Sequence, residues 1–312
     1  MGTLVGHVAP GLGFVVIGLW HLFNHTKLHA LNPTSYTAPP WFPAAKLKHL
    51  ELLLIMAASA ASVSMELFIG PERHQPLDPD GSIPSNHLQN LEHSSISLTF
   101  LLYAASALLL ERFHLHPPSK RALTQLLASI AFGQQLLLFH LHSADHVGPE
   151  GHFHSLLQLL VLLSLSTTLL GIPFPRSFIL SFLRSLTILF QGLWLLSMGF
   201  ILWTPALVPK GCFINHLHGH QVVRCSDHAS LHRALSLVHI LFSWFLIGVT
   251  AFGLAFYLAL FNLYSHNHNN NTLPYFPLDK EDNSSDDHAP TPNPKTFIHL
   301  PNNNFSPVHI ET

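Results

Sequence analysis

Charged side chains are scarce in this sequence, and their scarcity excludes an ordinary water-soluble protein. Lys, Arg, Asp and Glu make up 10% of the 312 residues, whereas a typical soluble domain carries about 25%. So few ionic groups cannot cover a soluble surface, and the apolar share of 48% indicates that lipid covers part of it. The 14 basic and 16 acidic residues nearly cancel, so the chain lacks the basic face that a nucleic-acid partner requires.

Cysteine and several catalytic motifs are also scarce or missing. The only cysteines are Cys212 and Cys225, which excludes a metal site built from paired CxxC motifs. The sequence contains no P-loop, dinucleotide fingerprint, HExxH motif or serine nucleophile elbow, so it gives no support to those enzyme classes. The two cysteines lie in one connection between apolar segments, and we expect a disulfide between them rather than two reduced thiols.

What the sequence does contain is a series of long apolar runs. Each is close to the ~20 residues that a helix needs to cross a bilayer core, and each must be helical because lipid cannot satisfy unpaired backbone groups. We therefore predict an all-α integral membrane bundle of seven transmembrane helices, with the lipid bilayer as its partner. The predicted spans are Leu4–Phe23, Leu50–Ile69, Leu91–Leu110, Ala122–Leu141, Phe153–Ile172, Phe178–Trp203 and Ala234–Leu263.

Basic residues in the connections predict the orientation of the bundle. With the N-terminus outside, seven Lys and Arg residues fall in cytoplasmic connections and four in outer ones, which favours an outer N-terminus and a cytoplasmic C-terminus. This orientation also places both cysteines on the oxidising side, where disulfides form. We predict a seven-helix domain over residues 1–264 and a disordered cytoplasmic tail, rich in Asn, Asp and Pro, over 265–312. The expected location is the plasma membrane or the endomembrane system.

Histidine is abundant, at 26 residues, and many histidines fall near the outer ends of the predicted spans. The segment FHLHSADHVGPEGHFH, residues 139–154, joins the fourth span to the fifth, and Glu92 and His93 open the third. Ionisable groups at membrane depth are expensive and seldom incidental. The sequence therefore predicts a buried polar cluster of His and Glu in the outer leaflet.

Imidazole and carboxylate groups are the ligands that suit zinc. A zinc site here would use His93, His142 and His154, with His140 and His232 as additional ligands. Glu92 or Glu150 would then be the catalytic carboxylate, acting as general base on metal-bound water. The alternative is a hydrogen-bonded polar network that holds no metal.

Other polar residues of the spans receive simpler interpretations. Five residues of the seventh span have the 4, 4, 3, 4 spacing of one helical face, which we expect to point into the bundle; they are His228, His232, Ser236, His239 and Ser243. We interpret His49 and Glu51 as interfacial residues at the cytoplasmic end of the second span. Arg184 is expected to extend toward the cytosol, and Gln191 to hydrogen-bond with a neighbouring helix.

Several motifs, in order along the chain, resemble the transmembrane protein 45 family, and its plant branch in particular. They are GHVAPGLGFVVIGLWH near the N-terminus, LEHSSISL at the third span, HLH followed by E-x3-H, and QGLWLLSMGFILW in the sixth span. The resemblance covers most of residues 1–263 and implies a seven-helix membrane protein of a family without an established biochemical activity. The matching positions are Gly6, His7, Pro10, Gly11, Gly18, Trp20, Glu92, His93, His140, His142, Glu150, His154, Gln191 and Trp194.

Three functional hypotheses follow from these observations. The first, implied by the resemblance, is a non-enzymatic membrane protein of trafficking, signalling or stress and defence responses. The second is an intramembrane zinc-dependent hydrolase of lipid or amide substrates. The third is a proton or metal-ion transporter that uses the histidines of the seventh span, although polar residues become sparse in that span beyond His239.

Overall fold

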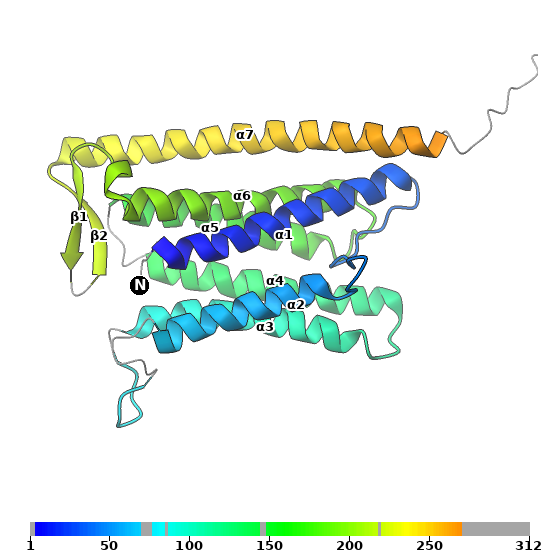
Figure 1. Ribbon diagram of the computed structural model, residues 1–312, viewed down its shortest axis with the longest axis horizontal. Coiled ribbons are helices and arrows are strands. Elements are labelled where there is room, and N and C mark those ends of the chain that lie inside the picture. The colour runs from blue at the N-terminus through cyan, green and yellow to red at the C-terminus, as the bar shows by residue number, and fades with distance from the viewer. Residues whose placement is uncertain (1–3, 70–76, 85–86, 144–147, 218–219, 270–312) are drawn as a thin grey trace, which may run out of the picture. The chain divides into compact units, whose positions relative to one another are not determined.

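The computed structural model describes residues 4–69, 77–84, 87–143, 148–217 and 220–269, without the side chains of residues 142, 143, 216, 217, 220, 221 and 265–269. The predicted tail over 265–312 therefore lies largely outside the described residues, and so does the side chain of His142. Within the described part, the architecture is helix packed on helix (Figure 1), and a short hairpin is the only sheet.

The prediction of seven membrane-spanning helices is confirmed, because seven helices are long and apolar enough to cross a bilayer. The chain is an integral multi-pass membrane protein with an all-α bundle. The helices are α1 (Leu4–Leu31), α2 (Leu50–Ser64) with its π-helical extension η1 (Met65–Ile69), α3 (Leu88–Leu110), α4 (Pro117–Ser143), α5 (Pro149–Leu170), α6 (Phe178–Trp203) and α7 (His228–Asn269). A single 3₁₀ turn, η3 (Pro205–Leu207), follows α6.

Helix α1 ends eight residues later than the apolar run predicts. We expected the span to end at Phe23, but the helix continues to Leu31. The added turns carry His25, Thr26 and His29, which are too polar for a hydropathy pattern to include. Since His25 and Thr26 are fully buried, packing against the rest of the bundle is what extends the helix.

Helices α1 and α6 form the most extensive contact of the bundle and run antiparallel (Figure 1). Glycine permits the close approach. A Cβ atom added to Gly18 would lie 2.5 Å from the backbone nitrogen of Leu189, and one added to Gly192 would lie 2.5 Å from that of Val15. Small residues at helix contacts have this role in membranes, where packing replaces the hydrophobic effect between helices.

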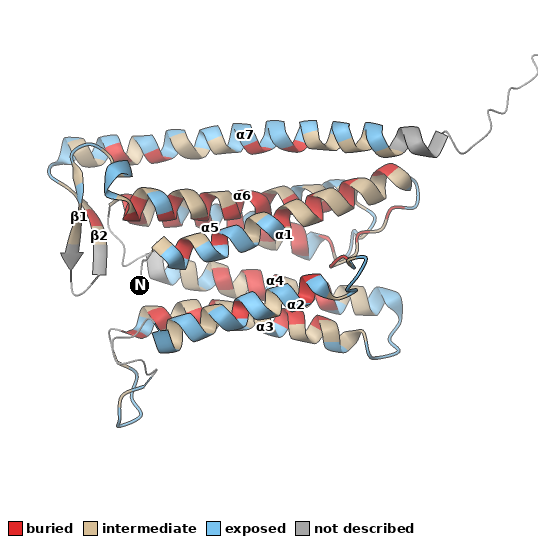
Figure 2. Cartoon of the chain, viewed as in Figure 1, coloured by how far each residue is buried: buried red, intermediate tan, exposed pale blue. Residues whose placement is uncertain are grey.

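Helix α6 is the centre of the bundle and α7 lies at its edge. In the most apolar window, 67% of α6 is buried but only 11% of α7, a contrast that Figure 2 shows. Trp194 and Met198 of α6 are fully buried against Phe153 and Leu157 of α5. The exposed side of α7 carries large apolar side chains such as Trp244, as expected of a surface that lipid covers.

The prediction that the polar stripe of α7 points into the bundle is wrong. His228, His232 and His239 are exposed, whereas the buried residues of α7 include Ala234 and Val238. Small and apolar side chains take the inner face of α7, and the imidazoles are left exposed.

A β-hairpin lies between α6 and α7. Strand β1 (Cys212–Leu217) pairs antiparallel with β2 (His220–Cys225), and Cys212 stands opposite Cys225 in the register. The two cysteines form a disulfide, which closes the base of the hairpin. We refer to the end of the bundle that bears it as the hairpin end; the predicted outer location of this end stays a prediction.

Candidate functional site

The buried carboxylate of Glu51, near the start of α2, is the centre of the most polar region inside the bundle. It accepts three hydrogen bonds, from His21 Nε2 at 2.7 Å, Trp20 Nε1 at 2.9 Å and the backbone N–H of Phe42 at 2.8 Å. Only 4% of Glu51 is exposed. An ionised carboxylate only accepts hydrogen bonds, and three donors meet Glu51, so we assign a negative charge to this position inside the bundle.

The imidazole of His25 lies one helical turn from His21 and links Tyr36 to Arg184. Its Nδ1 is 2.8 Å from the Tyr36 hydroxyl, and its Nε2 is 3.3 Å from Arg184 Nη2. Because a guanidinium can only donate, Nε2 must carry a lone pair, and the proton of the neutral ring is on Nδ1. His25 therefore donates to Tyr36, and the Tyr36 hydroxyl remains available to donate to Ser181.

The guanidinium of Arg184, in contact with His25, adds a positive charge to the same buried region. Arg184 is 5% exposed, and the charges of Glu51 and Arg184 interact across this region. Paired charges tolerate burial far better than single ones do. We name His21, His25, Tyr36, Glu51 and Arg184 the Glu51 site.

The expectation that Arg184 extends toward the cytosol is wrong, because its side chain is buried. Glu51 is buried as well, and its interpretation as an interfacial residue stays a prediction. The segment from residue 32 to 49 folds back across this end of the bundle and covers both side chains. A hydrogen bond from Ala38 N to Pro175 O, at 2.8 Å, attaches this segment to the connection that precedes α6. Tyr36, in the same segment, is only 3% exposed. His49 is half-buried beside Trp41, with ring centroids 5.4 Å apart.

Tyr36 lies outside the membrane-spanning segments, at the mouth of the Glu51 site. Burial raises the pKa of Tyr36 to about 12, against the opposing effects of the hydrogen bond with Ser181 and the charge of Arg184. The phenol therefore stays neutral in any physiological compartment and keeps its hydroxyl proton. It serves the site as a hydrogen-bonding group.

A second polar group lies at the hairpin end, where the sequence predicted one. The ring of His7 stacks on Trp203 with centroids 4.5 Å apart and meets His154 edge-on at 5.8 Å. His154 Nδ1 donates to the backbone carbonyl of Glu150 at 2.9 Å, which leaves the lone pair on Nε2. Glu150 is itself 4% exposed. The structure thus brings together three of the predicted positions, from α1 and α5.

His93 lies in a different contact from His154. Its Nδ1 is 3.4 Å from the carboxylate of Glu66 in η1, which also accepts a hydrogen bond from Asn90 at 2.8 Å. Glu92, next to it, is half-buried. Glu66 thus has the partners that an acid at membrane depth requires.

The remaining candidate ligands are dispersed. His140 Nδ1 is 3.2 Å from Gln158 Oε1, and His232 is exposed on α7. Among the side chains that the structure describes, which do not include His142, no three His, Cys, Asp or Glu residues are placed to hold one metal ion. The zinc site of His93, His142 and His154 stays a prediction.

Sequence reasoning missed the Glu51 site although signals for it exist. His21 and His25 are spaced i, i+4, which places them on one helical face. Arg184 interrupts the apolar run FILSFLRSLTILF, and an ionisable residue inside a span indicates a functional site by default. Tyr36 had no such signal, because only the fold of the connection brings it to His25.

The chain is similar to a described family and to a known membrane protein. Residues 121–258 match the sequence profile of a family described as "Family of unknown function (DUF716)". The chain is also similar to transmembrane epididymal protein 1A of Mus musculus, with 26% identity over 220 residues that cover 66% of this chain and 68% of that protein. Both similarities agree with a multi-pass membrane protein. The matched range of this chain includes the positions of Arg184, Glu150 and His154.

Proposed function

We propose that the protein is a non-enzymatic, proton-linked transport protein whose Glu51 site takes up and releases a proton inside the bundle. The observation that carries the proposal is the 2.7 Å contact between His21 Nε2 and Glu51 Oε1, with both side chains buried. Ionisable groups inside transmembrane bundles mark ion pathways and proton relays. Histidine suits this role because its ordinary pKa is near neutrality.

The hydrogen bonds define where the proton binds. Glu51 accepts three hydrogen bonds, and one of them comes from the Nε2 proton of His21. The free position is His21 Nδ1, which is buried and has no hydrogen-bond partner among the described residues. Protonation there converts a hydrogen bond into an ion pair and changes the combined charge of His21, Glu51 and Arg184 from zero to +1. The excess positive charge inside the bundle favours release of the bound proton, and a carrier must be able to release what it binds.

Polar groups extend from the Glu51 site in both directions. The ring of His25 lies 5.7 Å from that of His21, and Tyr36 continues the contact toward the bundle end. Toward the hairpin end, buried polar groups line the α5–α6 contact, where Ser164 Oγ is 3.2 Å from Thr187 Oγ1. The scarcity of polar residues in α7 therefore does not argue against a proton path, since α5 and α6 carry the polar groups.

The buried amide of Gln191 lies between the two polar regions. Neither its nitrogen nor its oxygen has a hydrogen-bond partner among the described residues, so the expected bond to a neighbouring helix is not formed there. A buried amide without partners has the capacity to bind water. We assign it a position in the proposed proton path.

Proton flux into liposomes tests the proposal. The full-length protein is reconstituted with a trapped pH-sensitive dye, and a potassium diffusion potential drives protons inward. The variant His21→Gln keeps a donor toward Glu51 but cannot titrate, so we expect it to slow the flux at least about tenfold, equivalent to ~1.4 kcal/mol. The matched control, His114→Gln, removes an exposed imidazole from the α3–α4 connection and should leave the flux unchanged. Equal flux in wild type, both variants and empty liposomes refutes the proposal.

A zinc-dependent hydrolase is the second candidate, and the geometry of His154 favours it. A zinc-bound imidazole commonly donates its other N–H to a backbone carbonyl, and His154 Nδ1 makes such a bond to Glu150 O. Metal analysis of purified protein separates the candidates: a hydrolase requires close to one equivalent of zinc, lost in His142→Ala. Less than about a tenth of an equivalent would rule out the catalytic zinc.

We further infer a relationship to the transmembrane protein 45 family, on the motifs quoted from the sequence. Its plant branch, and the trafficking, signalling or defence roles that the resemblance implies, are part of this proposal. A proton-linked transporter is compatible with such roles, because compartment pH affects membrane traffic and signalling. The motif positions His7, Glu150 and His154 adjoin one another at the hairpin end, which supports reading them as one motif group.

A further inference from the structure

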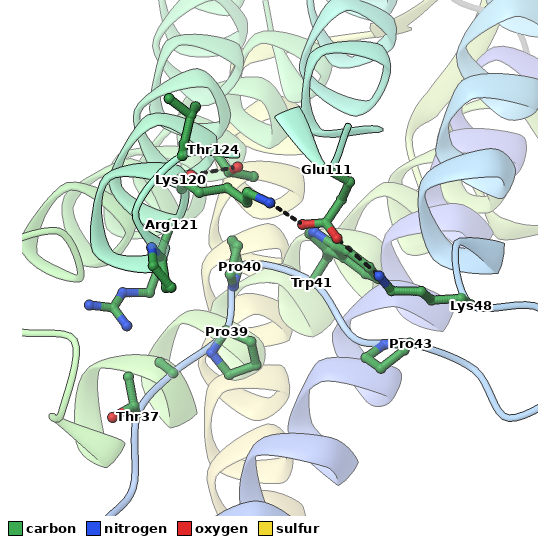
Figure 3. Close-up of a pocket in the computed structure, with 13 residues that line it drawn as sticks. Thr37, Pro39, Pro40, Trp41, Pro43, Lys48, Glu111, Lys120, Arg121 and Thr124 are labelled. Atoms are coloured by element: carbon green, nitrogen blue, oxygen red, sulfur yellow. Dashed lines mark hydrogen bonds and ion pairs between the residues drawn. The ribbon is translucent and has the colours of Figure 1, made fainter. Parts of the chain in front are cut away.

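A pocket of about 410 Å³ opens at the end of the bundle opposite the hairpin. It lies between the connection that precedes α2, the end of α3 and the first turns of α4 (Figure 3). Trp41 and the prolines Pro39, Pro40 and Pro43 form apolar walls. Proline restricts the backbone of this wall, so the pocket is largely preformed. It is separate from the Glu51 site and its proposed function.

The polar side of the pocket carries three basic groups and one acid. The carboxylate of Glu111 is 3.0 Å from Lys48 Nζ and 3.7 Å from Lys120 Nζ (Figure 3). Arg121 points away from this pair in Figure 3 and forms no ion pair within the part of the chain that the structure describes. Three positive charges against one negative charge leave an excess of +2.

Glu111 is held in its ionised form at the pocket. Burial alone would raise the pKa of its carboxyl, but the hydrogen bond from Lys48 and the charges of Lys48, Lys120 and His49 lower it below its usual value. The pocket therefore keeps its one negative charge at neutral pH. An anionic ligand must compete with Glu111 for the lysines, whereas Arg121 is available without competition.

We propose that this pocket binds the phosphorylated headgroup of an anionic membrane lipid. A phosphate monoester carries nearly two negative charges at neutral pH, which matches the excess of +2. The pocket adjoins the ends of transmembrane helices, where a headgroup lies, and clusters of Lys and Arg at such positions bind anionic lipids. Leu115 lines the pocket and is 40% exposed, so acyl chains have an apolar surface beside it. A soluble inositol phosphate would leave that surface unused.

Binding of short-chain lipids to the full-length protein in detergent tests the inference. The probes are short-chain phosphatidylinositol bisphosphate, short-chain phosphatidylcholine and soluble inositol trisphosphate. We expect the first to bind most tightly and phosphatidylcholine not to bind. The double variant Lys120→Gln/Arg121→Gln should raise the Kd about 25-fold, from about fivefold for each basic residue near a membrane surface.

Two single variants make the test specific for the pocket. Lys46→Gln removes an exposed charge of the same connection outside the pocket and should leave the Kd within about twofold. Glu111→Gln removes the competing carboxylate, so it should lower the Kd, an effect that misfolding cannot imitate. An unchanged Kd in the double variant, a higher Kd in Glu111→Gln, or binding of inositol trisphosphate as tight as that of the lipid would overturn the proposal.

Discussion

Enlarging Gly18 by one methyl group should separate the two central helices. The added Cβ would lie 2.5 Å from the backbone nitrogen of Leu189, whereas ordinary contacts begin at 3.4 Å. The obstacle is backbone, so α1 and α6 must move apart by about 0.9 Å at that point, and overpacking of this kind costs about 1–3 kcal/mol. The Glu51 site spans the same contact, because its histidines are on α1 and Arg184 is on α6.

Gly13 provides the control on the same helix. No atom lies within 4 Å of a Cβ added there. Gly13→Ala should therefore change stability only through helix propensity, which favours alanine over glycine by about 1 kcal/mol. We expect the thermal midpoint of the detergent-purified protein to fall in Gly18→Ala, by about 2–4 °C per kcal/mol, and to stay or rise in Gly13→Ala. A Gly18→Ala midpoint equal to or above that of Gly13→Ala would refute the close α1–α6 packing.

Three further predictions concern other contacts. Tyr36→Phe leaves the buried His25 Nδ1 without its hydrogen-bond partner and should cost about 1–3 kcal/mol of unfolding free energy. Denaturation of the purified variant measures this loss, and an unchanged stability would contradict the Tyr36–His25 hydrogen bond. Cys212→Ser opens the hairpin disulfide and should cost about 2–4 kcal/mol, while a reductant should lower the thermal midpoint of wild type but not of the variant. The lowered pKa of Glu111 stabilises the fold above the ordinary value of 4.5 and loses this effect as the pH falls further. The midpoint difference between wild type and Glu111→Gln should therefore shrink below pH 4.5, and a constant difference would contradict the Lys48 and Lys120 pairing.

The spans could be predicted because length and hydropathy alone decide them. Seven runs of about 20 apolar residues became seven helices, and the polar residues at the hairpin end fall where α1 and α5 begin. What local patterns could not give were the extension of α1 through His25 and the cover that residues 32–49 place over Glu51. Both depend on contacts between segments far apart in the chain, such as that of His25 with Arg184.

The side chains of α7 also show what a local sequence pattern cannot predict. Their spacing correctly placed five polar residues on one helical face, but spacing does not say which face packs. Polar groups are expected inside a membrane bundle, whereas the structure places Ala234 and Val238 on the inner face of α7. His239 instead contacts His152 at the edge of α5.

A double-mutant cycle on Glu51 and Arg184 tests the central claim, that one buried site contains both charges. Removing either charge alone leaves the other uncompensated, so Glu51→Gln and Arg184→Gln should each cost about 3–5 kcal/mol of unfolding free energy. The double variant leaves neither charge buried, and we predict a loss well below the sum, with a coupling energy of about 2–3 kcal/mol. Effects that add within about 0.5 kcal/mol would contradict the account, because independent sites behave in that way.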